Sequence, residues 1–368
     1  MMLVRLFSFV LGFALAVSAV YSAVQTFVLP RSAPDRLTTA VFRSVYSLFA
    51  LRLRRTSAYE ERDRALAFFA PAAVLTLIPV WYTFLLFGFA AMFWAVGVPT
   101  WYQAFKISGS SLLTLGFATS DGALQMVLTF VEAATGLILV ALLIAYLPTM
   151  YSAFSRRETN VSMLEVRAGS PPSAVDMLLR FHRIHGLQRL REQWATWEAW
   201  FADIEESHTS LAPLVFFRSP RSDKSWVTAA GAVLDAAALT LSTLDIPAAA
   251  EGPLCVRAGY LALRRIADLF DIQYNPDPHF PVDAISVTRA EFDAACGTLE
   301  TSGVPLKADR DQAWSDFAGW RVNYDRVLCA LTWLTMAPPS PWSGARPTHL
   351  SLMPFRRLPM ARRARRSQ

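Results

Sequence analysis

The chain reads Ser111-Leu112-Leu113-Thr114-Leu115-Gly116-Phe117-Ala118-Thr119 between two long apolar runs. Residues 100–113 are too few to cross a membrane, whereas the whole connection, 98–121, is too long and too apolar for a simple loop. At membrane depth such a segment is stable only where protein shields its backbone or where it lines a wet cavity. The sequence therefore predicts a re-entrant segment, with a short pore helix over 101–113 and an extended return over 114–118.

Three apolar runs predict transmembrane helices. Residues 6–29 and 65–105 carry no charge, and 123–151 is interrupted only by Glu132 and reaches its end near Pro148. At about 1.5 Å per residue, 6–29, 65–89 and 123–151 each exceed a hydrocarbon core of roughly 30 Å. The alternative for 6–29 is a cleaved signal peptide. Cleavage would leave the arginine-rich segment that follows outside, against the positive-inside rule.

The composition indicates a membrane part joined to a water-soluble part. Of 368 residues, 54% are hydrophobic and 17% are charged, and the mean hydropathy is +0.31. The formal net charge is +6, with arginine concentrated in 31–64 and 356–366, which favours contact with anionic membrane lipid over nucleic acid. The three cysteines, Cys255, Cys296 and Cys329, are widely spaced and predict neither a disulfide framework nor a metal site.

The basic residues also predict the orientation. In the connector 31–64, apolar and arginine residues alternate close to a helical period, which is typical of an amphipathic helix at a membrane surface. The alternative is a helix whose apolar face packs on the soluble domain. Arg156 and Arg157 follow the third run, so the connector and residues from 156 onward are expected in the cytoplasm and the connection 98–121 outside.

Residues 65–155 resemble the outer helix, pore helix, filter and inner helix of the bacterial two-helix potassium-channel family. Ser111-x-x-Thr114-Leu115-Gly116-Phe117 resembles the family's Thr-x-Thr-Thr-Val-Gly-Tyr. Glu132-Ala133-Ala134-Thr135-Gly136 resembles the Glu-x-x-x-Gly of some bacterial inner helices. In the family, backbone carbonyls of four such loops replace the water around the ion.

The resemblance implies a homotetramer in the bacterial inner (plasma) membrane, multi-pass and with its C-terminal domain cytoplasmic. The permeant species would be a monovalent cation, K⁺ by analogy. It also implies a role for each matching residue: a selectivity filter of Thr114, Leu115, Gly116, Phe117 and Ala118, an outer mouth with Thr119 and Asp121, pore-helix support from Ser111 and Glu132, and a gating hinge at Gly136.

Several positions depart from the family pattern. Ala118 stands where the second filter glycine belongs, and an L-residue in that geometry costs about 1–2 kcal/mol. Thr119 replaces the usual Asp, although Asp121 follows two residues later. Glu132 can be a buried anchor for the pore helix, because acids within membranes are costly unless paired. Gly136 can equally be a site of close helix packing.

The polar part, 156–337, predicts a cytoplasmic all-helical domain. Helical stretches are expected near 173–206, 224–244, 251–270, 288–301 and 308–336, and 338–368 is expected to be a basic disordered tail. Trp194, Trp197, Trp200 and Phe201 fall at helical spacing, which is typical of core or of a subunit interface. A dinucleotide-binding fingerprint is absent from the sequence, and the ligand of this domain, if it has one, is open.

Together these features predict an all-α membrane protein with three transmembrane helices, one re-entrant pore loop and a cytoplasmic helical domain. The function they favour is a pore-loop cation channel that the helical domain gates or assembles. The alternative is a non-conducting, membrane-anchored binding or scaffold protein with a degenerate pore fold. We expect no catalytic activity, because no nucleophile or hydrolase signature is present, and we expect no cofactor and no structural metal.

Overall fold

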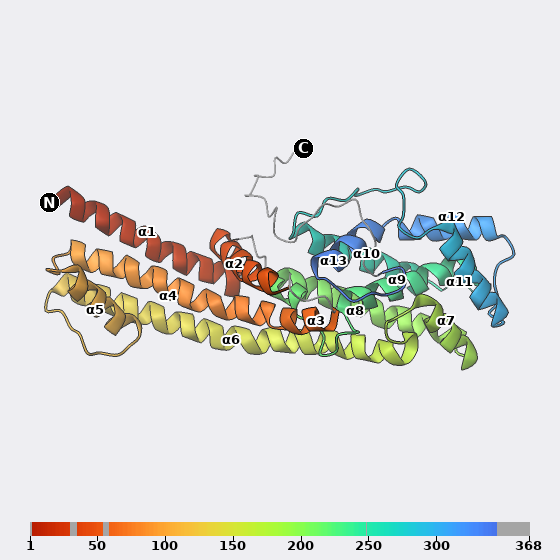
Figure 1. Ribbon diagram of the computed structural model, residues 1–368, viewed down its shortest axis with the longest axis horizontal. Coiled ribbons are helices and arrows are strands. Elements are labelled where there is room, and N and C mark those ends of the chain that lie inside the picture. The colour runs from red at the N-terminus through yellow and green to blue at the C-terminus, as the bar shows by residue number, and fades with distance from the viewer. Residues whose placement is uncertain (1, 30–34, 54–58, 248, 344–368) are drawn as a thin grey trace. The chain divides into compact units, whose positions relative to one another are not determined.

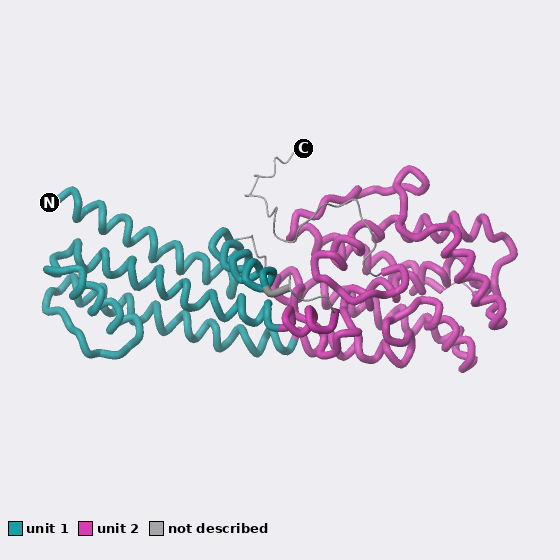
Figure 2. The backbone as a smooth tube through the Cα atoms, viewed as in Figure 1, with its two compact units in different colours: residues 1–52, 68–152 teal, residues 53–67, 153–368 magenta. Residues whose placement is uncertain are grey.

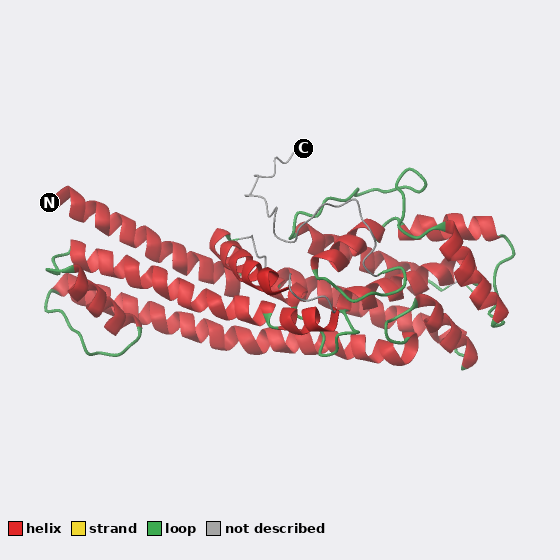
Figure 3. Cartoon of the chain, in the orientation of Figure 1, coloured by secondary structure: helices red, strands yellow, loops and turns green. Residues whose placement is uncertain are grey.

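The computed structural model describes residues 2–29, 35–53, 59–247 and 249–343. In this part of the chain every regular element is a helix (Figures 1 and 3), apart from one isolated antiparallel bridge between Leu244 and Leu306. Four helical segments are long and apolar enough to cross a membrane: Met2–Phe27, Tyr59–Ala95, Ala123–Ala168 and Trp226–Thr243. The all-helical prediction is confirmed, and the apolar helices suit a multi-pass membrane protein.

The chain folds as two compact units (Figure 2). Unit 1 comprises residues 1–52 and 68–152, and unit 2 comprises residues 53–67 and 153–368. Unit 1 holds the helices α1 (Met2–Phe27), α2 (Arg36–Leu53 as far as residue 52), α4 (Phe69–Ala95), α5 (Trp101–Leu112) and the part of α6 (Ala123–Ala168) before residue 153.

Helix α1 packs on α4 through small residues. A Cβ atom placed at Gly12 would lie 2.4 Å from the carbonyl oxygen of Gly88, and one at Gly88 would lie 2.7 Å from the carbonyl oxygen of Gly12. Ala16, Ala19 and Ala23 continue the buried face of α1. Small residues let two helix backbones approach closely where lipid gives no hydrophobic driving force.

Helix α2 covers the start of α4. Asp35 precedes the helix, and its carboxylate accepts a hydrogen bond from the backbone N–H of Thr38 at 2.9 Å, which satisfies one of the unpaired donors of the first turn. On the apolar face, the rings of Phe42 and Phe49 each lie 6.1 Å from the ring of Phe69. A helix is therefore observed where the sequence predicts one, with its apolar face packed partly on the first residue of α4, and its place at a membrane surface stays a prediction.

Helix α6 is longer than the apolar run that predicts it. The sequence suggests an end near Pro148, yet the helix passes through this proline and continues to Ala168. Proline removes one backbone donor but is accommodated in apolar helices when neighbouring groups satisfy the freed carbonyl. Residues 149–168, which follow it, contain neither proline nor glycine. They therefore lack the two residue types that most disfavour a helix interior.

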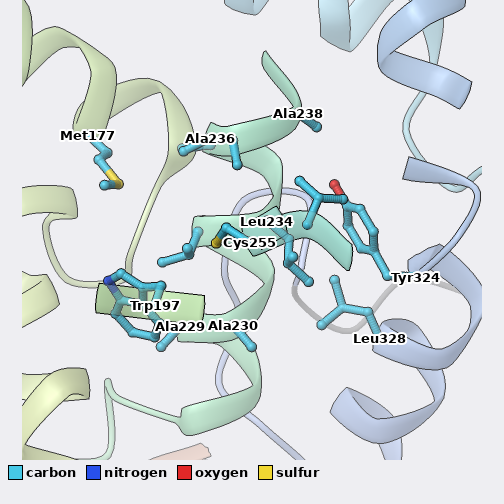
Figure 4. Close-up of a cluster of buried hydrophobic side chains, with 14 of the residues drawn as sticks. Met177, Trp197, Ala229, Ala230, Leu234, Ala236, Ala238, Cys255, Tyr324 and Leu328 are labelled. Atoms are coloured by element: carbon cyan, nitrogen blue, oxygen red, sulfur yellow. The ribbon is translucent and has the colours of Figure 1, made fainter. Parts of the chain in front are cut away.

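Unit 2 is built around α9 (Trp226–Thr243), whose candidate membrane-spanning window is 94% buried. Its small side chains, among them Ala229, Ala230 and Ala236, let the surrounding helices approach closely (Figure 4). The other helices of the unit are α3 (Tyr59–Ala67), α7 (Ala174–Arg183), α8 (Leu190–Ser210), α10 (Glu251–Asp268), α11 (Arg289–Thr301), α12 (Arg310–Arg321) and α13 (Asp325–Leu334), with the short 3₁₀ turns η1 (Leu187–Arg189) and η2 (Ala212–Phe216).

The predicted helical stretches 173–206 and 308–336 are each two helices. The aromatic residues of α8 are confirmed as core, since Trp194, Trp197, Trp200 and Phe201 are at most 3% exposed. Of the predicted tail, residues 344–368 lie outside the described residues. Ser343 is buried and its carbonyl oxygen accepts a hydrogen bond from Thr332 at 3.0 Å.

Candidate functional site

The candidate pore loop begins with α5, at the place where the sequence predicts a pore helix. Thr100 caps its N-terminus, because the Thr100 hydroxyl accepts a hydrogen bond from the backbone N–H of Gln103 at 3.2 Å. The helix ends at Leu112, and the residues that follow leave helical geometry, with Thr114 at φ 55° and Gly116 at φ 71°. The turn therefore uses the left-handed region twice within residues 111–119.

In the predicted filter, 114–118, backbone N–H groups form hydrogen bonds and the backbone carbonyl oxygens do not. The N–H groups of Leu115 and Gly116 both donate to the carbonyl oxygen of Ser110, at 2.8 and 3.4 Å, and the N–H of Ala118 donates to the Ser110 hydroxyl at 3.0 Å. Within the part of the chain that the structure describes, none of the carbonyl oxygens of 114–118 accepts a hydrogen bond. These carbonyls are thus available to an ion, to water or to another chain.

Ala118 does not adopt the left-handed conformation that the family's second filter glycine uses. Positive φ values in this stretch occur at Thr114 and Gly116. The backbone strain that the sequence predicts for Ala118 is therefore not found. An altered carbonyl direction at Ala118, relative to the resembling family's filter, stays a prediction.

Glu132 lies on α6, fully buried against α5. The hydroxyl of Ser108 donates to one oxygen of its carboxylate, Oε1, whereas no hydrogen bond reaches the other, Oε2, within the described residues. Ser111, which the sequence pairs with Glu132 in supporting the pore helix, instead donates to the backbone carbonyl of Thr129 at 2.7 Å. Two hydroxyls three residues apart on α5 therefore fasten the same face of that helix to α6.

Gly136 is a point of close approach between α6 and α5. A Cβ atom at this position would lie 2.5 Å from the carbonyl oxygen of Leu112, the last residue of α5. The carbonyl oxygen of Gly136 accepts a hydrogen bond from the Tyr82 hydroxyl at 2.8 Å. The geometry favours the close-packing interpretation of this glycine, and its role as a hinge stays a prediction.

Thr119 and Asp121, the predicted outer-mouth residues, are exposed and lie between the predicted filter stretch and α6. Sequence reasoning missed Lys106, on α5, whose ammonium nitrogen lies 5.8 Å from the centre of the Phe117 ring. This distance is within the range of a cation–π interaction. Residues 101–121 thus bring a positive charge close to the predicted filter stretch as well as the acid Asp121.

In unit 2, residues 214–218 contact both α6 and α3, the two helices from which the chain continues into unit 1. The buried guanidinium of Arg157, on α6, donates to the carbonyl oxygens of Leu214 and Phe217 at 2.9 and 2.8 Å. In the same segment, Arg218 forms an ion pair of 3.1 Å with Asp63 of α3.

His208 is buried beside the same arginine. Its Nε2 atom lies 3.2 Å from a guanidinium nitrogen of Arg157. Burial, followed by the neighbouring positive charge, holds the pKa of His208 well below 6.5. The imidazole is therefore neutral at pH 7, and Nε2 can accept a hydrogen bond from the guanidinium.

Comparison with known proteins adds no relative: no family model, no curated protein and no solved structure matches this chain.

Proposed function

We propose that this protein is a pore-loop cation channel that assembles as a homotetramer, with residues 114–118 of each chain facing the ion path. The observation that carries the proposal is the one-sided bonding of this stretch. Three of its N–H groups, those of Leu115, Gly116 and Ala118, donate to Ser110, while its carbonyl oxygens accept no hydrogen bond within the described residues. Rings of such carbonyls are what cation filters use in place of water.

Three of the four apolar segments are proposed to span the membrane: α1, α4 and the apolar part of α6. Their windows are 17–39% buried, so most of their apolar surface is open to lipid or to further copies of the chain. The fourth, α9, is 94% enclosed by its own unit, which favours a core helix of a water-soluble domain. Leu113, Leu115 and Phe117 are each more than half exposed, as expected if other chains complete the site.

We place unit 2 in the cytoplasm of a bacterium, on the basis of the basic residues at 31–64 and after 156. Its proposed contribution is control of the pore. The segment 214–218 binds α6 through Arg157 and α3 through Arg218, so a change in unit 2 that moves this segment would pull on both chain segments that continue into unit 1.

The test is electrical. Purified tetramers, verified by chemical cross-linking, would be reconstituted into planar bilayers, and unitary cation currents are expected. Leu115→Pro removes the N–H that bonds Ser110 and should abolish the current. The control Leu124→Ala changes an exposed side chain of α6 outside the loop and should conduct as the wild type does. Silent wild-type tetramers under all ionic conditions would defeat the proposal.

A non-conducting, membrane-anchored binding or scaffold protein is the second candidate. The observation that favours it is Lys106, because a fixed ammonium 5.8 Å from the Phe117 ring repels a cation in the filter. On this alternative, removal of the Lys106 charge would leave the reconstituted protein silent.

A further inference from the structure

Unit 2 contains a cavity of about 370 Å³, within the size range of small-ligand sites. Its walls come from three places that are distant in sequence: η1 with the start of α8, the end of α9 with the segment after it, and the start of α10. Lys307 completes the wall. The cavity is formed within this unit alone, so occupancy does not depend on conduction.

The charged residues among the walls are both basic. Arg191 and Lys307 line the cavity, and no aspartate or glutamate does. The acids nearest in sequence, Glu192, Asp245 and Glu251, are not among the lining residues, and Glu192 is paired with Arg189 at 3.4 Å. Two cations without an acidic partner in the wall favour an anion as the occupant.

The two cations differ in how they are held. Among the described residues, the exposed Arg191 has no hydrogen-bond or ion-pair partner, so its guanidinium can turn to a ligand without losing a contact. Lys307 is fixed by its backbone, since its N–H donates to the carbonyl oxygen of Thr243 at 2.9 Å beside the bridge between Leu244 and Leu306. Its ammonium donates to the carbonyl oxygen of Leu241 at 2.8 Å and has two further donors.

The rest of the wall has an apolar part. Its accessible side chains include the half-buried Leu187, Leu241 and Ile246, whereas Trp194, Leu190 and Leu244 are at most 2% exposed and offer a ligand almost no surface. A bare inorganic anion would leave this surface without a partner, whereas a flat or aliphatic body would cover it. The wall therefore selects for a ligand with an acidic group at one end and an apolar body at the other.

We propose that this cavity binds a small amphipathic organic anion, whose acidic group pairs with Arg191 and Lys307 and whose apolar body packs on Leu187, Leu241 and Ile246. Such a ligand would be recognised by the helical unit independently of the pore.

Calorimetric titration of the full-length protein in detergent tests the proposal, with the heat of ligand entering protein-free micelles subtracted. The probes are 1-naphthyl phosphate, 2-naphthoate, neutral 2-naphthol and inorganic phosphate. We expect at least one naphthyl anion to bind with one site per chain, and 2-naphthol and inorganic phosphate to bind at least tenfold more weakly. Equal binding of the neutral compound, equal binding of inorganic phosphate, or no binding of either naphthyl anion would each overturn the proposal.

Variants locate the site. Arg191→Gln and Lys307→Gln each change an exposed side chain and should weaken binding at least tenfold without changing the thermal unfolding midpoint. Arg326→Gln, which removes the same charge from an exposed position on α13, should bind as the wild type does. Unchanged affinity in both cavity variants, or equal loss in the α13 variant, would show that the anion binds elsewhere.

Discussion

The replacement Gly136→Ala should disturb the filter stretch itself, because α6 and α5 are in backbone contact at this residue. The added Cβ would lie 2.5 Å from the carbonyl oxygen of Leu112, and ordinary van der Waals contact begins at 3.4 Å, so the two helices must separate by about 0.9 Å. Leu112 lies inside the turn that is closed by the hydrogen bond of 2.8 Å from the Leu115 N–H to the Ser110 carbonyl oxygen, and this turn leads directly into residues 114–118. The displacement at Leu112 is therefore expected to reach residues 114–118.

The energy of this change follows from two opposing terms. Overpacking a close contact costs about 1–3 kcal/mol, and replacing a helical glycine by alanine returns about 0.5–1 kcal/mol. We expect Gly136→Ala to lose about 1–2 kcal/mol of stability. Gly109→Ala is the matched control, since its nearest neighbour is the flexible Leu86 side chain at 3.6 Å, and it should be as stable as the wild type or slightly more so.

Two assays on the same preparations decide the matter. Thermal unfolding in detergent should show a lower midpoint for Gly136→Ala but not for Gly109→Ala. Recordings with K⁺ on one side and Na⁺ on the other should show a changed permeability ratio for Gly136→Ala. If this variant instead keeps the wild-type midpoint and permeability ratio and changes open probability alone, Gly136 acts as a hinge and the packing argument is refuted.

Three further changes have defined outcomes. Lys106→Gln should raise unitary cation conductance about twofold or more, because the positive charge beside Phe117 is lost. Lys106→Arg keeps the charge and should leave the conductance unchanged. Equal conductance in the two variants would show that the Lys106 charge does not repel the permeant cation. Gly88→Val should lower the thermal unfolding midpoint, because its Cβ would meet the α1 backbone at 2.7 Å, at a cost of about 1–3 kcal/mol; an unchanged midpoint would contradict the close packing of α1 on α4. The pKa of His208 is lowered in the folded chain, so below about pH 6.5 the unfolded chain binds a proton at this residue and the folded chain does not. The free energy of unfolding should therefore fall, as the pH drops below that value, by up to about 1.4 kcal/mol per pH unit. His208→Gln should flatten this slope in thermal unfolding measured between pH 7 and 5, and an identical slope would rule out His208 as its source.

The helices were largely predictable because apolar length and helical period are local properties of the sequence. The predicted pore helix over 101–113 is observed as Trp101–Leu112, and a threonine directly before it supplies the cap. The extent of α6 was not predictable in the same way. Pro148 removes a donor, yet the helix continues beyond it to Ala168, because one lost backbone hydrogen bond does not by itself end a long helix.

The partners within the candidate site were less accessible to sequence reasoning. The sequence predicts that Glu132 anchors the pore helix, but it does not say which serine of α5 bonds it. That choice, Ser108 or Ser111, depends on how α5 is rotated about its axis, and the spacing of residues along the chain does not fix this rotation. In the sequence Lys106 is one charge on a short helix, and only the structure shows that its ammonium lies close to the Phe117 ring. The basic cavity of unit 2 joins Arg191 to Lys307 across more than a hundred residues, a juxtaposition that no local pattern contains.

Whether residues 114–118 line a cation path is decided by the reversal potential of reconstituted tetramers between K⁺ and Na⁺ solutions, measured for the wild type and for Ala118→Gly. Both should carry unitary cation currents, and Ala118→Gly should show the higher ratio of K⁺ to Na⁺ permeability, because glycine allows the carbonyl geometry that the family's filter uses. Absence of current from both proteins, or currents with an unchanged or lower permeability ratio in Ala118→Gly, would contradict the account.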